Sequence, residues 1–244
     1  MREMLEFFIQ AYSVPTVISV IVGYLLGSIS FSILFTKLFI HKDIRDFGSG
    51  NAGATNVLRS VGKLPALLTF IGDFAKQVAA ILIAKAVFLN FATSHELVEA
   101  TTAIRYAVYL AGVSCFLGHI YPLYFGFRGG KGVITAAAMM ALIDWRVFLI
   151  ELAIFVAFMC WKRIVSLSSI ACGASYPIVT FLVTYFIDYQ QYLTGAENGR
   201  PIIYVIVATF MTAIVGFLVV FRHRSNIVRL LNGTEKPIFE KKAK

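Results

Sequence analysis

Seven apolar runs dominate this sequence, and most of them are long enough for a helix that crosses a membrane. About 20 residues of α-helix span the hydrocarbon core of a bilayer. Hydrophobic residues make up 59% of the 244 residues and charged residues only 14%, a balance that excludes an ordinary soluble domain. We therefore predict an all-α, polytopic integral membrane protein with about seven transmembrane helices in a single domain, residues 1–244. The expected spans are residues 14–35, 64–92, 104–124, 132–143, 147–161, 165–187 and 202–221.

Three of these spans need comment. Residues 132–143 and 147–161 are short, so they are tilted, re-entrant or parts of one broken hairpin around Asp144. Residues 1–12 lack the basic region and the small-residue cleavage site of a secretory signal. The first apolar run is therefore expected to be a retained helix.

Basic residues fall on alternate sides of these spans. Lys and Arg number five in residues 37–63, two in 128–131, two in 162–163 and seven in 222–244, against four on the opposite side. By the positive-inside rule, the basic side faces the cytoplasm. We expect a multi-pass protein of the cell inner membrane, with its N-terminus outside and its C-terminus in the cytoplasm. This asymmetry explains much of the net charge of +9 without nucleic acid as a partner.

The first polar motif on the basic side is GSGNAGATNVLR, Gly48 to Arg59, within the segment 43–62. Its glycines permit positive φ angles and close approach of the backbone to a ligand: Gly48, Gly50 and Gly53. Ser49 or Asn51 is expected to cap a short helix running to about Val61, whose free N–H groups would bind phosphate.

That short helix would present a polar face beside the anion site. Thr55, Asn56 and Arg59 are three and four residues apart, so they share one helical face. The same segment is also typical of an interfacial helix with a capped loop. Its GxGxxG spacing, with Asp73 further on, matches a dinucleotide fingerprint by accident, because that site requires a preceding strand and a βαβ unit.

The second motif, GHIYPLYFGFRGGKGV, covers residues 118–133. Gly129, Gly130 and Gly132 around Lys131 are expected to form a nest of backbone N–H groups suited to a phosphoryl group. Arg128 adds a guanidinium that can hold two phosphate oxygens. A Walker loop is excluded, because Gly132 stands where that motif needs Ser or Thr for magnesium. The alternative is a glycine turn with basic membrane anchors.

The third motif, HRSNIVRLLNGTE, follows the last span within residues 222–235. His223, Asn226 and Arg229 are spaced by three, so one face of a juxtamembrane helix would present all three side chains. Such a segment is also typical of a basic anchor for anionic membrane lipid.

Small and charged residues inside the spans carry two further predictions. Gly23 and Gly27 form a GxxxG pair that would let another helix approach closely. Asp73 and Lys76, three residues apart in the second span, are expected to form an ion pair, because a lone charge in a membrane is costly. The pair is interpreted first as structural or supporting a site, and second as part of an ion pathway. The three cysteines are interpreted as packing residues without a metal or disulfide: Cys115, Cys160 and Cys172.

Together, the three motifs resemble those of the PlsY family, the bacterial membrane acyl-phosphate:glycerol-3-phosphate acyltransferases. Their order spans most of the chain, and three long motifs together are far more specific than any one. Two features depart from the family: Ser30 stands where a proline is usual, and the loop after Phe91 is long. The resemblance implies transfer of an acyl group from acyl phosphate to the C1 hydroxyl of glycerol 3-phosphate, giving lysophosphatidic acid, with no cofactor or metal.

By this resemblance and the chemistry of the motifs, we expect two groups of site residues. The catalytic group is Ser49, Asn51, Arg59, Lys131, His223 and Asn226. The group that binds substrate and phosphate is Gly48, Gly50, Gly53, Thr55, Asn56, Arg128, Gly129, Gly130, Gly132 and Arg229.

The reaction needs no protein nucleophile. An acyl phosphate is a mixed anhydride with a good leaving group, so holding it beside the hydroxyl supplies most of the catalysis. Arg59, Lys131 and Arg229 would offset the repulsion between two anionic substrates. In the family a substrate phosphate oxygen is thought to accept the hydroxyl proton, and His223 is the alternative base.

Two other functions were weighed against this one. His41 and Asp46 match the HX4D spacing of acyltransferases that use a thioester donor, but Ile40 precedes the histidine and no second motif of that family follows. A transporter of an organic phosphate would carry its site near the membrane midplane on broken helices. Here the polar motifs all lie on one side of the membrane.

Overall fold

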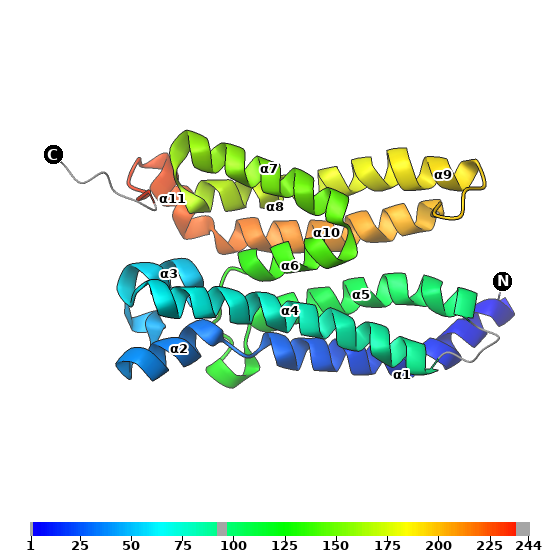
Figure 1. Ribbon diagram of the computed structural model, residues 1–244, viewed down its shortest axis with the longest axis horizontal. Coiled ribbons are helices and arrows are strands. Elements are labelled where there is room, and N and C mark those ends of the chain that lie inside the picture. Colours follow the sequence, from blue (N-terminus) through cyan, green and yellow to red (C-terminus); the bar gives the residue numbers. More distant parts are fainter. Residues whose placement is uncertain (1, 92–96, 238–244) are drawn as a thin grey trace. The chain divides into compact units, whose positions relative to one another are not determined.

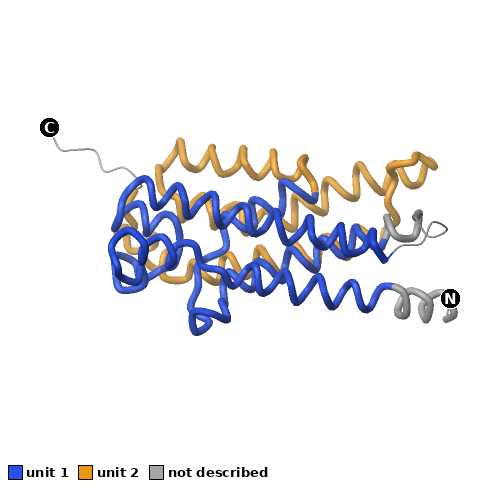
Figure 2. Tube along the Cα trace, turned by 60° about the horizontal axis from the view of Figure 1, so that its bottom comes forward, with its two compact units in different colours: residues 1–143 blue, residues 144–244 orange. Residues whose placement is uncertain are grey.

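The computed structural model describes residues 2–91 and 97–237, and within these ranges it contains helices and no strand. The all-helical fold predicted from the sequence is thereby confirmed. Residue contacts divide the chain into two compact units, unit 1 (residues 1–143) and unit 2 (residues 144–244), shown in Figure 2. Each unit is described by itself, and the prediction of a single domain stays a prediction. The long loop expected after Phe91 falls on residues 92–96, outside the described residues.

Unit 1 is built on three long helices (Figure 1). Its elements are α1 (Arg2–Gly27), α2 (Phe31–Ile40), the 3-10 turn η1 (Ile44–Asp46), α3 (Ala54–Ser60), α4 (Lys63–Phe91), α5 (Leu97–Ile120), the 3-10 turn η2 (Leu123–Phe125) and α6 (Val133–Ile143). Helix α1 packs against α4 and α5, and α4 also packs against α5 and α6.

Glycines bring α1 and α5 close together. A Cβ added to Gly27 would lie 2.0 Å from the Cys115 carbonyl oxygen, and one added to Gly118 would lie 2.3 Å from that of Tyr24. At Gly23 the same test gives 2.8 Å to the Ala111 carbonyl oxygen. The close helix contact predicted from the GxxxG pair is therefore confirmed.

The first predicted span is interrupted. Helix α1 ends at Gly27 and α2 begins at Phe31, with Ser30 in an extended conformation at its N-cap. The Ser28 Oγ donates to the Tyr24 carbonyl at 2.8 Å and accepts from the Leu123 N–H at 3.2 Å. A broken helix inside a membrane needs such partners for its freed backbone groups.

Unit 2 consists of helices joined by short turns. Its elements are α7 (Trp145–Lys162), α8 (Val165–Val183), the π-helical segment η3 (Thr184–Tyr189), α9 (Gln190–Leu193), α10 (Ile202–Arg222) and α11 (Arg224–Leu231). Helix α8 packs against α7 and α10. A Cβ on Gly216 would lie 2.2 Å from the Gly173 carbonyl oxygen, so α8 and α10 meet closely there.

A charge cluster joins the N-terminal end of α7 to the π-helical segment. Arg146 donates to Asp144, the N-cap of α7, and its Nη1 lies 2.8 Å from Asp188 Oδ1. The Arg200 N–H donates to the Asp188 carbonyl at 2.9 Å. Arg146 and Arg200 thus tie Asp188 to both α7 and the start of α10.

Five helical stretches among the described residues are long and apolar enough to cross a membrane: Tyr12–Ile40, Lys63–Phe91, Ala103–Phe125, Val165–Leu193 and Ile202–Arg222. They coincide with five of the predicted runs. Helix α6, with 11 residues, is about 16 Å long and therefore shorter than the hydrocarbon core of about 30 Å. Helix α7 has 18 residues but carries Arg146, Glu151 and Lys162. The count of seven spans stays a prediction.

Candidate active site

The first two polar motifs meet in unit 1. Phe125 of the second motif packs on the buried apolar cluster that contains Ala52 and Val57 of the first. A Cβ added to Gly130 would lie 2.7 Å from the Ala52 carbonyl oxygen, so the two backbones approach closely at this point. Two of the three motifs are therefore neighbours, and the third lies in unit 2.

Arg45 ties these two segments together. Its guanidinium donates to Asp43 through Nε at 3.1 Å and Nη2 at 2.8 Å, and its Nη1 donates to the Phe125 carbonyl at 2.7 Å. Burial alone would raise the pKa of Asp43, but the hydrogen bonds and charge of Arg45 outweigh it, and this pKa lies below its ordinary value. The sequence singled out neither residue, because Arg45 lies three positions before the glycine motif.

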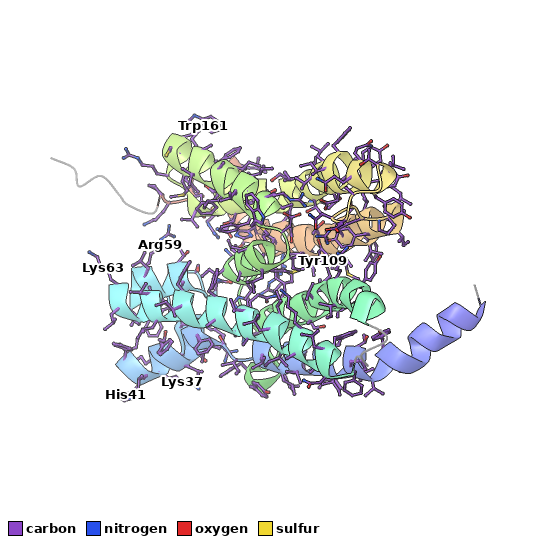
Figure 3. The ribbon with its side chains drawn as sticks, turned by 45° about the vertical axis from the view of Figure 1, so that its right-hand side comes forward. Lys37, His41, Arg59, Lys63, Tyr109 and Trp161 are labelled. Carbon is purple, nitrogen blue, oxygen red and sulfur yellow. The ribbon has the colours of Figure 1, made fainter. Side chains whose placement is uncertain are left out.

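We expect Arg45→Ala to weaken binding of an anionic substrate more than it weakens the fold. The contacts are half-buried, and hydrogen bonds to charged groups contribute about 1.5–3 kcal/mol each, so the apparent KM for such a substrate should rise roughly tenfold. Initial rates and thermal unfolding would be measured in detergent. Lys63→Ala, which removes an exposed charge at the end of unit 1 that carries Lys37, His41 and Arg59 (Figure 3), is the control. Equal KM values for the two variants would contradict this role.

Asn56 organises the loop of the first motif. Its buried Nδ2 donates to the carbonyls of Phe47 at 2.9 Å and Asn51 at 3.1 Å, and its Oδ1 accepts from the Ser49 N–H at 3.1 Å. The expectation that Asn56 binds substrate is therefore revised, because its amide already holds the loop. Gly48 stands against this amide, with a φ of 55°.

The predicted cap of the short helix is wrong. Helix α3 begins at Ala54, after Gly53 at its N-cap, so Ser49 and Asn51 lie before the helix and do not cap it. The positive φ angles expected at Gly48 and Gly50 are confirmed, whereas Gly53 is extended with a φ of −155°. Extended backbone there lets the chain turn directly into α3 without a side-chain cap.

The predicted N–H nest of the second motif is also revised. The Gly129 N–H donates to the Ile120 carbonyl at 3.1 Å, and the Gly130 N–H donates to the His119 carbonyl at 3.2 Å. These two glycines cap the C-terminal end of α5, so their N–H groups are not offered to a phosphate. A Cβ on Gly129 would lie 2.0 Å from the His119 carbonyl oxygen, which explains the need for glycine.

Another source of N–H groups stands beside Lys131. Helix α6 starts at Val133, and its ladder begins with the Ala136 N–H donating to the Gly132 carbonyl at 2.8 Å. The N–H groups in the first turn of a helix have no partner within that helix and favour an anion. Gly132 has a φ of 80°, and it turns the chain from Lys131 into α6.

His223 lies at the junction of two helices in unit 2. It ends α10 and precedes α11, so it is not on the face of a continuous helix as predicted. Its Nδ1 lies 2.7 Å from the Val219 carbonyl oxygen. Because a carbonyl only accepts, Nδ1 must carry the proton, which leaves Nε2 as the basic nitrogen of the neutral ring.

The Glu235 carboxylate binds three side chains of unit 2. It accepts hydrogen bonds from Ser166 Oγ and Asn226 Nδ2, both at 2.6 Å, and from Arg229 Nε. Asn226 and Arg229 therefore share one face of α11, as predicted. Glu235 belongs to the third motif, yet no anion-binding role called for a carboxylate, and nothing in the sequence pointed to Ser166.

The remaining predicted residues fall in unit 1. The side chains of Ser49, Arg59 and Arg128 are exposed, and those of Asn51, Thr55 and Lys131 are half-buried. The predicted ion pair in the second span is confirmed, with Lys76 Nζ 2.8 Å from Asp73 Oδ1.

Comparison with known proteins decides the family. Residues 17–233 match the family described as glycerol-3-phosphate acyltransferase. The chain belongs to this family. The glycerol-3-phosphate acyltransferase of Clostridioides difficile is 40% identical over 226 residues, which are 93% of this chain and 97% of that protein. That of Syntrophomonas wolfei is 38% identical over 218 residues, 89% of this chain and 94% of that protein.

Solved structures support the same family. The crystal structure of PlsY, an integral membrane glycerol 3-phosphate acyltransferase, in its glycerol 3-phosphate form is 35% identical, with a TM-score of 0.71. The match covers 92% of this chain and 96% of that one. The lysophosphatidic acid form of PlsY matches with a TM-score of 0.67 at 34% identity. The resemblance to PlsY found in the three motifs is confirmed, and this acyltransferase-family chain is an integral membrane protein.

Proposed function

We propose that this protein transfers the acyl group of an acyl phosphate to the C1 hydroxyl of glycerol 3-phosphate, releasing phosphate and lysophosphatidic acid. One observation carries the proposal: the chain matches PlsY over nearly its whole length, in crystal forms with glycerol 3-phosphate and with lysophosphatidic acid. The contact between the first two motifs in unit 1 supports it, because the first motif contributes Arg59 and the second contributes Lys131 and the start of α6, which are groups suited to an anion.

In this proposal the protein crosses the cell inner membrane about seven times. Its N-terminus lies outside, and its C-terminus and reaction site lie on the cytoplasmic side. Lys37, His41, Arg59 and Lys63 gather at one end of unit 1 in Figure 3. Helix α1 begins at the other end of this unit (Figure 1). Both observations support the orientation given by the positive-inside rule.

In this proposal the cations act on the charges of the substrates and the leaving group. Lys131 and the first turn of α6 hold a phosphate, and Arg59, Arg128 and Arg229 offset the repulsion between two anions. Ser49, Asn51 and Thr55 donate hydrogen bonds to substrate oxygens. Preorganised donors of this kind stabilise the charge that develops on the acyl oxygen and the departing phosphate.

The reaction forms the ester bond between the C1 oxygen and the acyl carbon and breaks the bond between that carbon and the phosphate oxygen. The hydroxyl proton passes either to a substrate phosphate oxygen or to His223 Nε2, whose lone pair is set by the Val219 contact. Asn226, held by Glu235, is a hydrogen-bond donor for the same step.

Donor choice tests the proposed function. Purified protein would be assayed with glycerol 3-phosphate and one of three donors: acyl phosphate, acyl-CoA or acyl carrier protein. We expect lysophosphatidic acid from acyl phosphate alone, because only this donor provides phosphate as leaving group without a protein nucleophile. Turnover of a thioester without turnover of acyl phosphate would favour the HX4D alternative. Here His41 is the C-cap of α2, with its N–H donating to the Lys37 carbonyl.

The transporter alternative has less support from the structure. The charge pair inside the second span, whose second interpretation was an ion pathway, is engaged within unit 1, where Lys76 contacts His119 and the Ile29 carbonyl as well as Asp73. Product formation by detergent-solubilised protein, without any sealed compartment, would exclude transport as the primary activity.

A further inference from the structure

A buried ion pair with a histidine lies beneath the contact between the first two motifs. Asp73, Lys76 and His119 are only 1%, 4% and 7% exposed. Replacing a buried ion pair with apolar residues is often neutral or stabilising, so stability alone is a weak reason for these charges. The atoms that contact these three side chains indicate a role in positioning the backbone around them.

Lys76 is hydrogen-bonded to the Ile29 carbonyl and to His119 Nδ1, and it forms an ion pair with Asp73. Its Nζ lies 2.8 Å from Asp73 Oδ1, 2.7 Å from the Ile29 carbonyl oxygen and 3.0 Å from His119 Nδ1. The Ile29 carbonyl precedes the ladder of α2, which starts with the Leu34 N–H donating to the Ser30 carbonyl. Lys76 therefore satisfies a backbone group that the break between α1 and α2 would otherwise leave unpaired in the membrane.

The same contact fixes the proton of His119. An ammonium group only donates, so Nδ1 must present its lone pair to Lys76, and the neutral ring carries its proton on Nε2. This Nε2 points at the second motif, because a Cβ added to Gly130 would lie 2.2 Å from it. The Ala52 carbonyl of the first motif lies on the same side of Gly130, 2.7 Å from that Cβ position.

We propose that Asp73, Lys76 and His119 form a positioning chain that holds Gly129–Gly132, and with it Lys131, in register with the first motif. Asp73 and Lys76 anchor Nδ1 of His119 from within the membrane span, and Nε2–H of His119 fixes the place where the two motifs cross. The inference rests on the proposed role of Lys131 in holding a substrate phosphate. It adds to that role three residues that do not contact substrate.

Two substitutions at His119 distinguish the role of Nδ1 from the role of Nε2. In His119→Asn the amide reaches the position of Nδ1, so it keeps an acceptor for Lys76 but has no donor at Nε2. In His119→Gln the amide nitrogen reaches the position of Nε2, so it keeps the donor toward Gly130. A purely structural histidine that serves only Lys76 would tolerate Asn better than Gln, whereas the positioning chain predicts the reverse.

The measurement is the KM for glycerol 3-phosphate and the kcat with saturating acyl phosphate, in detergent, together with thermal unfolding. Because His119→Asn removes the donor at the point where the two motifs cross, we expect it to raise KM about tenfold or more, and we expect His119→Gln, which keeps that donor, to raise it less than about threefold. We further expect faster hydrogen exchange of the Gly129 and Gly130 amides in His119→Asn. Wild-type KM and exchange in His119→Asn would overturn the inference, as would a greater loss in His119→Gln.

A third variant separates this inference from the proposed function. Lys131→Ala should raise the same KM by at least as much as His119→Asn. If Lys131→Ala leaves KM unchanged, the role proposed for Lys131 fails, and the positioning chain fails with it. If Lys131→Ala raises KM and His119→Asn does not, only the positioning chain is refuted.

Discussion

Asn56→Ala is expected to remove nearly all acyltransfer activity and to lower the melting temperature clearly. The substitution leaves the Ser49 N–H and the carbonyls of Phe47 and Asn51 without their side-chain partner. A fully buried unsatisfied group costs about 1–3 kcal/mol, and these three contacts are only partly buried, so water offsets part of the loss and we expect the free energy of unfolding to fall by roughly 2–4 kcal/mol in total. Because the loop carries Ser49 and Asn51 themselves, kcat/KM should fall about 100-fold or more. Release of phosphate from acyl phosphate, dependent on glycerol 3-phosphate, and thermal unfolding in detergent would measure both effects.

Two neighbouring substitutions show whether the amide itself matters. Asn56→Asp keeps an oxygen for the Ser49 N–H but places a negative charge against the carbonyls of Phe47 and Asn51, so it should be as harmful as alanine. Ser60→Ala removes only a 3.5 Å contact to Asn56 Oδ1 and should stay within about threefold of the wild-type rate. If Asn56→Ala kept the wild-type kcat, KM and melting temperature, Asn56 would not be organising the loop.

The sequence predicted those features that depend on one segment. Apolar runs of membrane length gave five stretches that the structure confirms. The Asp73–Lys76 ion pair was predicted from two opposite charges one helical turn apart in an apolar run, because an unpaired charge is costly inside a membrane. The close contact at Gly23 and Gly27 followed from a spacing on one helix face. Each of these rests on local spacing and on the membrane as solvent.

What the sequence missed depends on contacts between distant segments. The nest of the second motif was predicted from glycine content, but the N–H groups of Gly129 and Gly130 are used by carbonyls at the end of α5. A turn motif does not say whether its donors face a ligand or the preceding helix. Likewise, an amide such as Asn56 suits a ligand or a loop equally well, and only the position of nearby carbonyls decides between them.

Charged residues in and beside the motifs were interpreted by the sign of their charge alone, so the roles of Arg45 and Glu235 were not predicted. Cations were assigned to anionic substrates, so the prediction had no place for Glu235 and gave no reason to separate Arg45 from other basic residues. In the structure Arg45 binds Asp43 and a backbone carbonyl of the second motif. Charges that meet within the protein position the motifs, and sequence spacing does not reveal these partners.

Glu235→Ala is expected to lower kcat about 100-fold while changing the KM for glycerol 3-phosphate less. Its carboxylate orients Asn226 and Arg229 and ties them to Ser166 at the start of α8. Removing it leaves Asn226, proposed to act in the proton-transfer step, without this hydrogen bond, and a barrier higher by about 2.7 kcal/mol corresponds to a 100-fold lower rate. Single-turnover rates at saturating substrate and thermal unfolding at pH 7 would measure the change. Glu197→Ala, which removes one exposed negative charge of unit 2, should behave as wild type.

The pH dependence of stability tests whether the charge of Glu235 is what matters. Burial alone would raise the pKa of Glu235, but the hydrogen bonds from Ser166, Asn226 and Arg229 and the charge of Arg229 hold this pKa below its ordinary value. A lowered folded-state pKa stabilises the protein above the ordinary value of 4.5 and loses this contribution as pH falls through the folded-state value. Wild type should therefore be more stable than Glu235→Gln at pH 7, because Gln turns one acceptor into a donor facing Arg229, and the two curves should converge as pH falls below 4.5 and through the lowered folded-state pKa. A constant difference in melting temperature between the two proteins down to pH 3 would show that shape, and not charge, holds the third motif in place.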